Sequence, residues 1–215
     1  MRLFPFFQDI EGKNFLVLGG GAVAAEKVKR LQAFTDRIVV IAERSEILGV
    51  KVLRRPFEEA DLALADYCVC ATDDAELNAR VAGLCAERGI PVNVVDNPAL
   101  CGFVFPALVK RGDLVIGITT AGKSPAYASL LREQIEAMLP EGVETVLERL
   151  GRMRRYVQRR VPDQAKRRRI CHLLLDALLE TRGEAAEVYY MYLCNQNITI
   201  RIGQSDAHRH SRKYR

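Results

Sequence analysis

Three consecutive glycines follow an apolar run in the segment FLVLGGGAVAAEKVKRL, residues 15–31. The segment can be matched to the motif G-x-G-x-x-A with Gly19, Gly21 and Ala24. In such a motif the first glycine permits a tight turn, the second lets a phosphate approach the backbone, and the small third residue lets helix and strand pack closely. The free N–H groups of the first helical turn would then face a pyrophosphate. The motif alone is weak, but its position between a predicted strand and a predicted helix favours a nucleotide site over a structural turn.

A carboxylate follows the second predicted strand, where an adenosine ribose would need one. Glu43 lies about twenty residues after the glycines, and an acid there often accepts hydrogen bonds from the ribose. This favours NAD over NADP, because a carboxylate repels a 2′-phosphate, although the adjacent Arg44 could tolerate one. The other interpretation is that Glu43 only caps the following turn.

Polar residues also follow two later strands. Thr72 and Asp73, in CATDD, are expected to line the cofactor cleft, because ligands of open α/β sheets bind beyond the carboxyl ends of the strands. Capping of the next helix is the other interpretation, and both roles can coexist. Asp96 follows a strand at the same sheet edge. Beside a nicotinamide it could accept a proton, but an Asp-Asn-Pro turn explains it equally well.

Short, nearly uniformly apolar strands are predicted to position these residues: NFLVLG, RIVVIA, KVLRRPF, DYCVCAT and PVNVVD. Such strands are typical of a parallel sheet that is buried on both faces. The helical patterns AAEKVKRLQAF and DAELNARVAGLCAERG alternate with them and imply right-handed βαβ units. The predicted fold class is therefore α/β, with a Rossmann-like parallel sheet domain followed by a small strand segment and a helical C-terminal domain.

The pattern changes after Pro98, where two strands joined near KRGD are predicted. A helix should then begin with Ser124 as N-cap and Pro125 as first helical residue. From Pro140 to about Leu193 the chain is predicted to be helical. The expected organisation is an NAD-binding Rossmann domain at 1–112, a strand and helix segment at 113–140, to which the family resemblance given below assigns dimerisation, a helical C-terminal domain at 141–194 and a disordered polar tail at 195–215.

Composition and charge limit the class of protein. The chain has 215 residues, and no apolar run approaches the roughly 18–20 residues that span a bilayer, so we expect a cytoplasmic protein with no membrane partner. The net charge is +5, and basic residues are concentrated between Arg149 and Arg169. Because no stacking aromatic residues are interleaved there in a single-strand-binding pattern, we interpret them as solvated helix faces or a surface attracting an acidic small molecule, without a nucleic-acid partner.

Cysteine and histidine usage argues against disulfides and metal ligation. None of the six cysteines forms a C-x-x-C pair, and a disulfide framework is not expected in a cytosolic chain of this size. Cys68 and Cys70 would share one face of a buried strand as small buried thiols. His208 and His210 form an isolated H-x-H in the polar tail, so no metal site is predicted.

Several segments, taken together and in order, resemble the precorrin-2 dehydrogenase family, the dehydrogenase module of sirohaem synthase, which sometimes has sirohydrochlorin ferrochelatase activity. They are FLVLGGGAVAAEKVKRL, CATDDAELN and NVVDNPALCGFVFPALVKRGDLVIGITTAGKSPAYASLLREQIE. The resemblance covers about residues 3–190. Its NVVD-x-P and GKSPA-x-A-x-x-L-R patterns are much more specific than the glycine loop.

The resemblance implies that NAD oxidises precorrin-2, a tetrapyrrole with many carboxylates, to sirohydrochlorin. It also implies a homodimer whose helical part helps dimerisation. The family's key aspartate falls on Asp96, the expected general base, and Ser124 falls near the tetrapyrrole site. The helix start at Ser124 would offer N–H donors to a substrate carboxylate, and Lys123 adds charge there. By the same match, the NAD site includes Ala22, Val23, Glu43 and Arg44.

The chain departs from the family pattern at several points. The segment between the second and third strands is short, Glu43 stands where proline is common, and Ala121 stands where glycine is common. Two alternatives to a dehydrogenase acting alone stay open: a bifunctional dehydrogenase and ferrochelatase, and a non-catalytic NAD-sensing protein. From the chain length, the methyltransferase portion of trifunctional sirohaem synthases is not expected.

Overall fold

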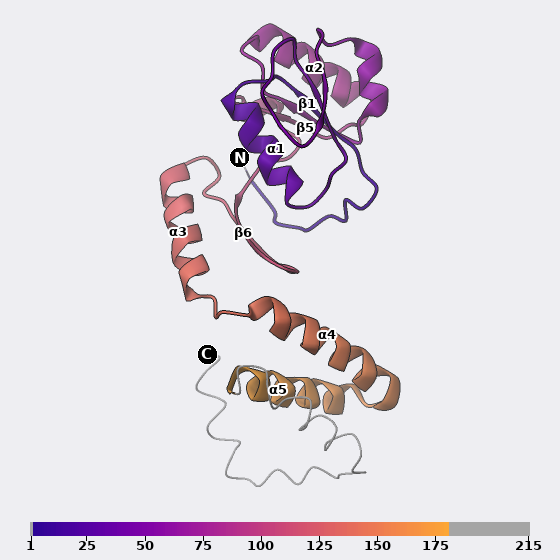
Figure 1. The fold of residues 1–215 in the computed structure, drawn as a ribbon, viewed down its shortest axis with the longest axis vertical. Helices are drawn as coiled ribbons and strands as arrows, with labels where there is room; N and C mark the ends of the chain where they lie inside the picture. Colours follow the sequence, from indigo (N-terminus) through magenta and orange to yellow (C-terminus); the bar gives the residue numbers. More distant parts are fainter. Residues whose placement is uncertain (1, 181–215) are drawn as a thin grey trace. The chain divides into compact units, whose positions relative to one another are not determined.

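The computed structural model describes residues 2–180. The expected polar tail, and the end of the expected helical domain, lie outside the described residues. The chain divides into two compact units (Figure 1). The first contains the chain up to Pro106 together with residues 121–123, and the second contains Ala107–Thr120 and the chain from Ser124 onward.

The first unit is built on a five-stranded, entirely parallel sheet with the strand order β3-β2-β1-β4-β5. The strands are β1 (Phe15–Leu18), β2 (Ile38–Ile41), β3 (Lys51–Leu53), β4 (Tyr67–Cys70) and β5 (Val92–Val94). Central β1 is buried along its whole length, and its Leu18 is level with Ile41 and Cys70, the last residues of the neighbouring strands. The carboxyl ends of these three strands therefore form one edge. The predicted α/β, Rossmann-like class is confirmed.

Successive residues of the central strands supply two separate hydrophobic cores, as the period of two requires. Leu16 and Leu18 pack with helix α2 (Ala75–Glu87), whereas Phe15 and Val17 pack with helix α1 (Ala22–Gln32). Both faces of the sheet are thus covered, which explains the uniformly apolar strands. Two short 3-10 helices, Glu59–Leu64 (η1) and Pro98–Leu100 (η2), complete the unit.

The paired cysteines of β4 lie in the core on the α2 side. Cys68 and Cys70 are completely buried, with their sulfur atoms 4.0 Å apart, as expected for two side chains on one face of a strand. Hydrogen bonding to Cys70 and Cys85, together with burial, raises the pKa of Cys68 far above its usual value. The buried-thiol interpretation of this pair is confirmed.

The second unit begins with an antiparallel hairpin, β6 (Ala107–Arg111) and β7 (Leu114–Ile118). The boundary expected at residue 112 would separate these two strands, whereas the structure keeps them together because they pair along their whole length. Helices α3 (Pro125–Met138), α4 (Val143–Arg160) and α5 (Gln164–Glu180) follow. Within residues 2–180, no helix is long and apolar enough to cross a membrane.

The turn before α3 explains one departure from the family pattern. Ala121 has a φ of 53° and Gly122 a φ of 83°, so both adopt the left-handed conformation that glycine tolerates best. Ser124 then caps α3 as predicted, because its side chain accepts a hydrogen bond from the Tyr127 N–H at 3.2 Å. The left-handed backbone at position 121 therefore suits glycine better than the alanine found there.

Candidate functional site

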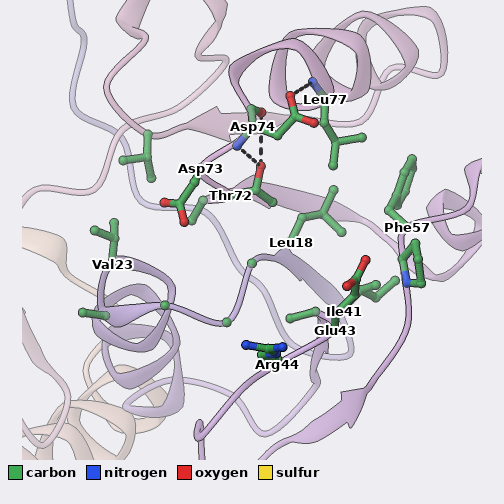
Figure 2. Close-up of a pocket in the computed structure, with 18 of the residues that line it drawn as sticks. Leu18, Val23, Ile41, Glu43, Arg44, Phe57, Thr72, Asp73, Asp74 and Leu77 are labelled. Carbon is green, nitrogen blue, oxygen red and sulfur yellow. Dashed lines mark hydrogen bonds between the residues drawn. The ribbon is translucent and has the colours of Figure 1, made fainter.

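A cleft of about 900 Å³ lies in the first unit beyond the carboxyl ends of β1, β2 and β4 (Figure 2). Three polar segments line it: the glycine loop, the residues after β2 and the residues after β4. Figure 2 shows Asp73 and Asp74 on one side of the cleft and Glu43 and Arg44 on the other. Of the predicted site residues, the cleft gathers Gly19, Gly21, Ala22, Val23, Glu43, Arg44, Thr72, Asp73 and Asp96.

Each of the three positions in the loop is glycine for a different physical reason. A Cβ at Gly19 would overlap the Ala71 carbonyl, and the residue has a φ of +110°. A Cβ at Gly20 would overlap the carbonyl oxygen of Arg44. At Gly21 a Cβ would meet no protein atom within 4 Å, although the residue lines the cleft. Gly19 and Gly20 are therefore required by the fold, whereas Gly21 leaves open space where a ligand can approach.

Helix α1 starts at this open space with its first N–H groups uncapped. Gly21 is its N-cap, no side chain in the described part of the chain caps it, and its first turn has no acidic residue. By contrast, Asp74 caps α2 by accepting a hydrogen bond from the Leu77 N–H at 2.9 Å. The free donors and the helix dipole at α1 suit an anion such as a pyrophosphate.

The wall after β2 carries charges of both signs. Glu43 and Arg44 are exposed and line the cleft. The carboxylate of Glu43 would favour a cofactor with a free ribose hydroxyl, whereas the guanidinium of Arg44 would favour one with a 2′-phosphate. A second arginine of the lining, Arg55, donates two hydrogen bonds to buried Asp61, at 2.9 and 2.6 Å. The guanidinium of Arg55 holds the pKa of Asp61 below its ordinary value. Because its charge is already paired, Arg55 is the weaker candidate for binding a phosphate.

The wall after β4 is held by a small polar network. The Thr72 hydroxyl donates to Oδ1 of Asn78 at 2.7 Å, and Nδ2 of Asn78 returns a hydrogen bond to the Thr72 carbonyl at 2.9 Å. Asn78 itself is buried in α2. Asp74, not Thr72 or Asp73, caps the helix, so the side chain of Asp73 is left on the cleft lining.

Asp96 occupies the turn after β5 in a left-handed conformation, with a φ of 59°. Asp is one of the few non-glycine residues that visits this region, at a cost of about 1–2 kcal/mol. Two side chains hold the following loop: Asn93 donates to the Phe103 carbonyl at 3.0 Å, and the Cys101 thiol accepts from the Val94 N–H at 3.3 Å. Asp96 is therefore both a turn residue and an exposed carboxylate on the cleft lining.

Three predicted site residues lie elsewhere. Ala24 is fully buried on the face of α1 that packs against the sheet, which fits close helix–strand packing and not ligand contact. Lys123 is exposed in the turn before α3, and Ser124 belongs to the second unit, where its N–H also bonds to the Thr120 hydroxyl at 3.0 Å. Neither is part of the cleft lining.

Sequence reasoning missed several residues of the lining, among them Gly20, Arg55, Phe57, Leu77 and Val95. Gly20 had a signal, since three glycines in a row exceed what the motif needs. Arg55 and Phe57 had none, because they reach the cleft from the segment after β3.

The fold and the cleft are those of an α/β protein of the dinucleotide-binding type, and two family models match the chain. One, described as "Putative NAD(P)-binding", matches residues 6–107. The other, described as "Sirohaem biosynthesis protein central", matches residues 111–138. The first match covers the parallel sheet and the cleft, and the second covers β7 and α3.

Curated relatives give the particular family. The sirohaem synthase of Thioalkalivibrio sulfidiphilus is 38% identical over 184 residues, which are 82% of this chain and 38% of that protein. The sirohaem synthase of Nitrosospira multiformis is 36% identical over 187 residues, 81% of this chain and 40% of that protein. The predicted resemblance to the precorrin-2 dehydrogenase module of sirohaem synthase is confirmed, and the chain spans about two fifths of the length of these relatives.

A solved structure shares the fold. SirC, a precorrin-2 dehydrogenase, matches with a TM-score of 0.67 over 89% of this chain and 98% of that chain. The sequence identity is 21%, so this likeness concerns the fold.

Proposed function

We propose that this protein oxidises precorrin-2 to sirohydrochlorin with NAD, and that Asp96 is the general base. The observation that supports this most directly is that Asp96, in its left-handed turn, lines the same cleft as the glycine loop. A carboxylate held in a sparsely populated conformation at a ligand cleft suggests a functional constraint. The names of the sirohaem synthase relatives and of the SirC structure point to the same pathway.

The cleft fits a dinucleotide. The open space at Gly21 and the uncapped start of α1 would hold the pyrophosphate, and the residues after β2 would meet the adenosine ribose. When bound, NAD supplies the hydride acceptor. We favour NAD over NADP because the Glu43 carboxylate opposes a 2′-phosphate, with adjacent Arg44 as the counter-argument. Titration with both cofactors tests this preference, and tighter binding of NADP would reverse it.

In the proposed reaction, Asp96 accepts one proton. The macrocycle loses a hydride and a proton, and loss of the hydride acidifies the neighbouring C–H. The Asp96 carboxylate takes that proton, which contributes about 10²–10⁴-fold to the rate for a positioned base. Its exposure lets it pass the proton on to water afterwards.

The test is oxidation of precorrin-2 with NAD, followed by the absorbance of sirohydrochlorin. Asp96→Asn is the sharpest variant, because asparagine tolerates the left-handed backbone and lacks the basic oxygen. We expect turnover to fall about 100-fold or more, with NAD affinity unchanged. Asp113→Asn, in the exposed turn of the hairpin, is the matched control. Unchanged turnover in Asp96→Asn would disprove the assignment.

The same assay separates the other functions. If the purified wild type binds NAD without turnover, the protein is a sensor and the enzyme proposal fails. Addition of Fe²⁺ or Co²⁺ to the product tests chelation, which requires metal-dependent conversion above the spontaneous rate. We further expect a homodimer, which sedimentation measures independently of activity.

A further inference from the structure

Asp96 lies in a tight four-residue turn that runs from Val94 to Asn97. The Asn97 N–H donates to the Val94 carbonyl at 3.3 Å, and Asp96 is the third residue of the turn, with a φ of 59°. A positive φ at the third position of such a turn favours glycine or asparagine. An aspartate keeps this conformation only when its surroundings hold it there. The position of the Asp96 carboxylate therefore depends on contacts made by the neighbouring residues.

The thiol of Cys101 makes such contacts at both ends of the turn. Its sulfur accepts a hydrogen bond from the Val94 N–H at 3.3 Å. The sulfur is also 3.2 Å from the carbonyl oxygen of Val94 and 3.4 Å from that of Asn97. A thiol has one hydrogen, so it donates to one of these two oxygens at a time. The thiol thus links the last residue of β5 to the last residue of the turn.

The backbone on either side of the turn is itself fixed, so the thiol has a rigid base. The N–H of Gly102, directly after Cys101, donates to the Val92 carbonyl at 2.8 Å. Buried Asn93 donates to the Phe103 carbonyl at 3.0 Å. The side chain of Cys101 is half-buried and packs against the core on the α2 side of the sheet.

Cys101 is not part of the cleft lining, whereas Val95 and Asp96 are. Any effect of the thiol on the reaction would therefore pass through the turn. We propose that Cys101 is a positioning residue, whose thiol keeps the Asp96 carboxylate at the place where the general base has to be. This inference rests on the proposed function, because it takes Asp96 as the base. Misplacement of a catalytic group by about 1 Å can cost about a hundredfold in rate.

The experiment compares wild type with Cys101→Ala, which removes the thiol, and with Cys101→Ser, which keeps a donor and an acceptor there. Cys171→Ala is the matched control, since that thiol is also half-buried but lies on α5 of the second unit. At saturating NAD, we expect kcat for precorrin-2 to fall about tenfold in Cys101→Ala, with KM and NADH affinity unchanged. Cys101→Ser should recover most of the rate, and Cys171→Ala should behave as wild type. Circular dichroism confirms that each variant is folded.

A double-mutant cycle separates positioning of the base from a general effect on the structure. In the Asp96→Asn background the base is absent, so Cys101→Ala should lower the remaining single-turnover rate by less than about twofold. Amide hydrogen exchange provides a readout that needs no turnover. Residues 94–97 should exchange faster in Cys101→Ala than in wild type, whereas the glycine loop should exchange equally in both proteins.

Other results would overturn the inference. An unchanged kcat in folded Cys101→Ala, with an active wild type, would reject it and leave the proposed function standing. An equal loss of rate in both backgrounds, or a raised KM, would assign the thiol to the general structure of the cleft. Failure of Cys101→Ser to recover the rate, or unchanged exchange in residues 94–97, would exclude the hydrogen bonds as the cause. If the wild type does not turn over, the proposed function fails, and the role of Cys101 fails with it.

Discussion

At the scale of single residues, the three consecutive positions of the glycine loop are glycine for different physical reasons. Gly19 needs its positive φ and its close approach to Ala71, Gly20 needs its close approach to Arg44, and Gly21 faces open space. Only the open space at the third glycine bears on ligand binding.

The difference gives a prediction for two single substitutions. Gly19→Ala should destabilise the protein by more than about 2 kcal/mol, because the new methyl group overlaps a carbonyl and the backbone is strained. Gly21→Ala should change the free energy of unfolding by less than about 1 kcal/mol, since φ is −79° and the space is empty. It should nevertheless weaken NAD binding, through crowding of the pyrophosphate.

Urea denaturation and NADH fluorescence titration measure the two effects separately. Wild-type NADH affinity in Gly21→Ala would reject the placement of the pyrophosphate. Wild-type stability in Gly19→Ala would contradict the steric argument for the turn.

At the scale of elements, η1 holds one wall of the cleft through a single buried carboxylate. Asp61 accepts the Glu58 N–H at 2.8 Å and both hydrogen bonds from Arg55. It therefore caps the short helix and fixes a residue of the cleft lining at the same time.

The pKa of Asp61 predicts how this element responds to acid. Its folded-state pKa is lowered, first by the Arg55 hydrogen bond, below the unfolded value of about 3.9. The stabilisation is therefore fully present above that value and is lost as pH falls through the folded-state pKa. Asp61→Asn should cost about 1–3 kcal/mol at pH 7, as for hydrogen bonds to a charged group, and the difference from wild type should shrink below about pH 4.

Urea denaturation over a pH series checks this, with Asp113→Asn as the exposed control. A stability difference that stays constant down to pH 3 would contradict the role of the ionised carboxylate.

At the scale of the whole molecule, the cleft belongs to one of the two compact units. A bound ligand stabilises the folded state of the part that it contacts, by about 2.7 kcal/mol when the ligand concentration is a hundred times Kd. We therefore expect saturating NAD to slow amide hydrogen exchange in residues 18–23, 41–44 and 71–74, as measured by mass spectrometry. The strand β6 should be protected less. Exchange that is unchanged in the glycine loop would contradict the proposed cofactor site.

Local patterns were enough to predict the elements. The apolar strands, the glycine turn and the Ser124 cap each depend on neighbours within a few residues, and the structure contains all of them. The two βαβ units follow from their order, because parallel crossovers have one hand. The motifs NVVD-x-P and GKSPA also identified the family.

Contacts between distant segments were decided by the tertiary structure. The carbonyl of Arg44 that excludes a side chain at Gly20, and the aromatic ring of Phe105 beneath Lys27, come from segments far along the chain. The sequence alone left Asp96 equally a turn residue or a base, and the fold made it a turn residue on the cleft lining. Local periodicity carries no information about which loops meet at a sheet edge, because strand order and packing determine that.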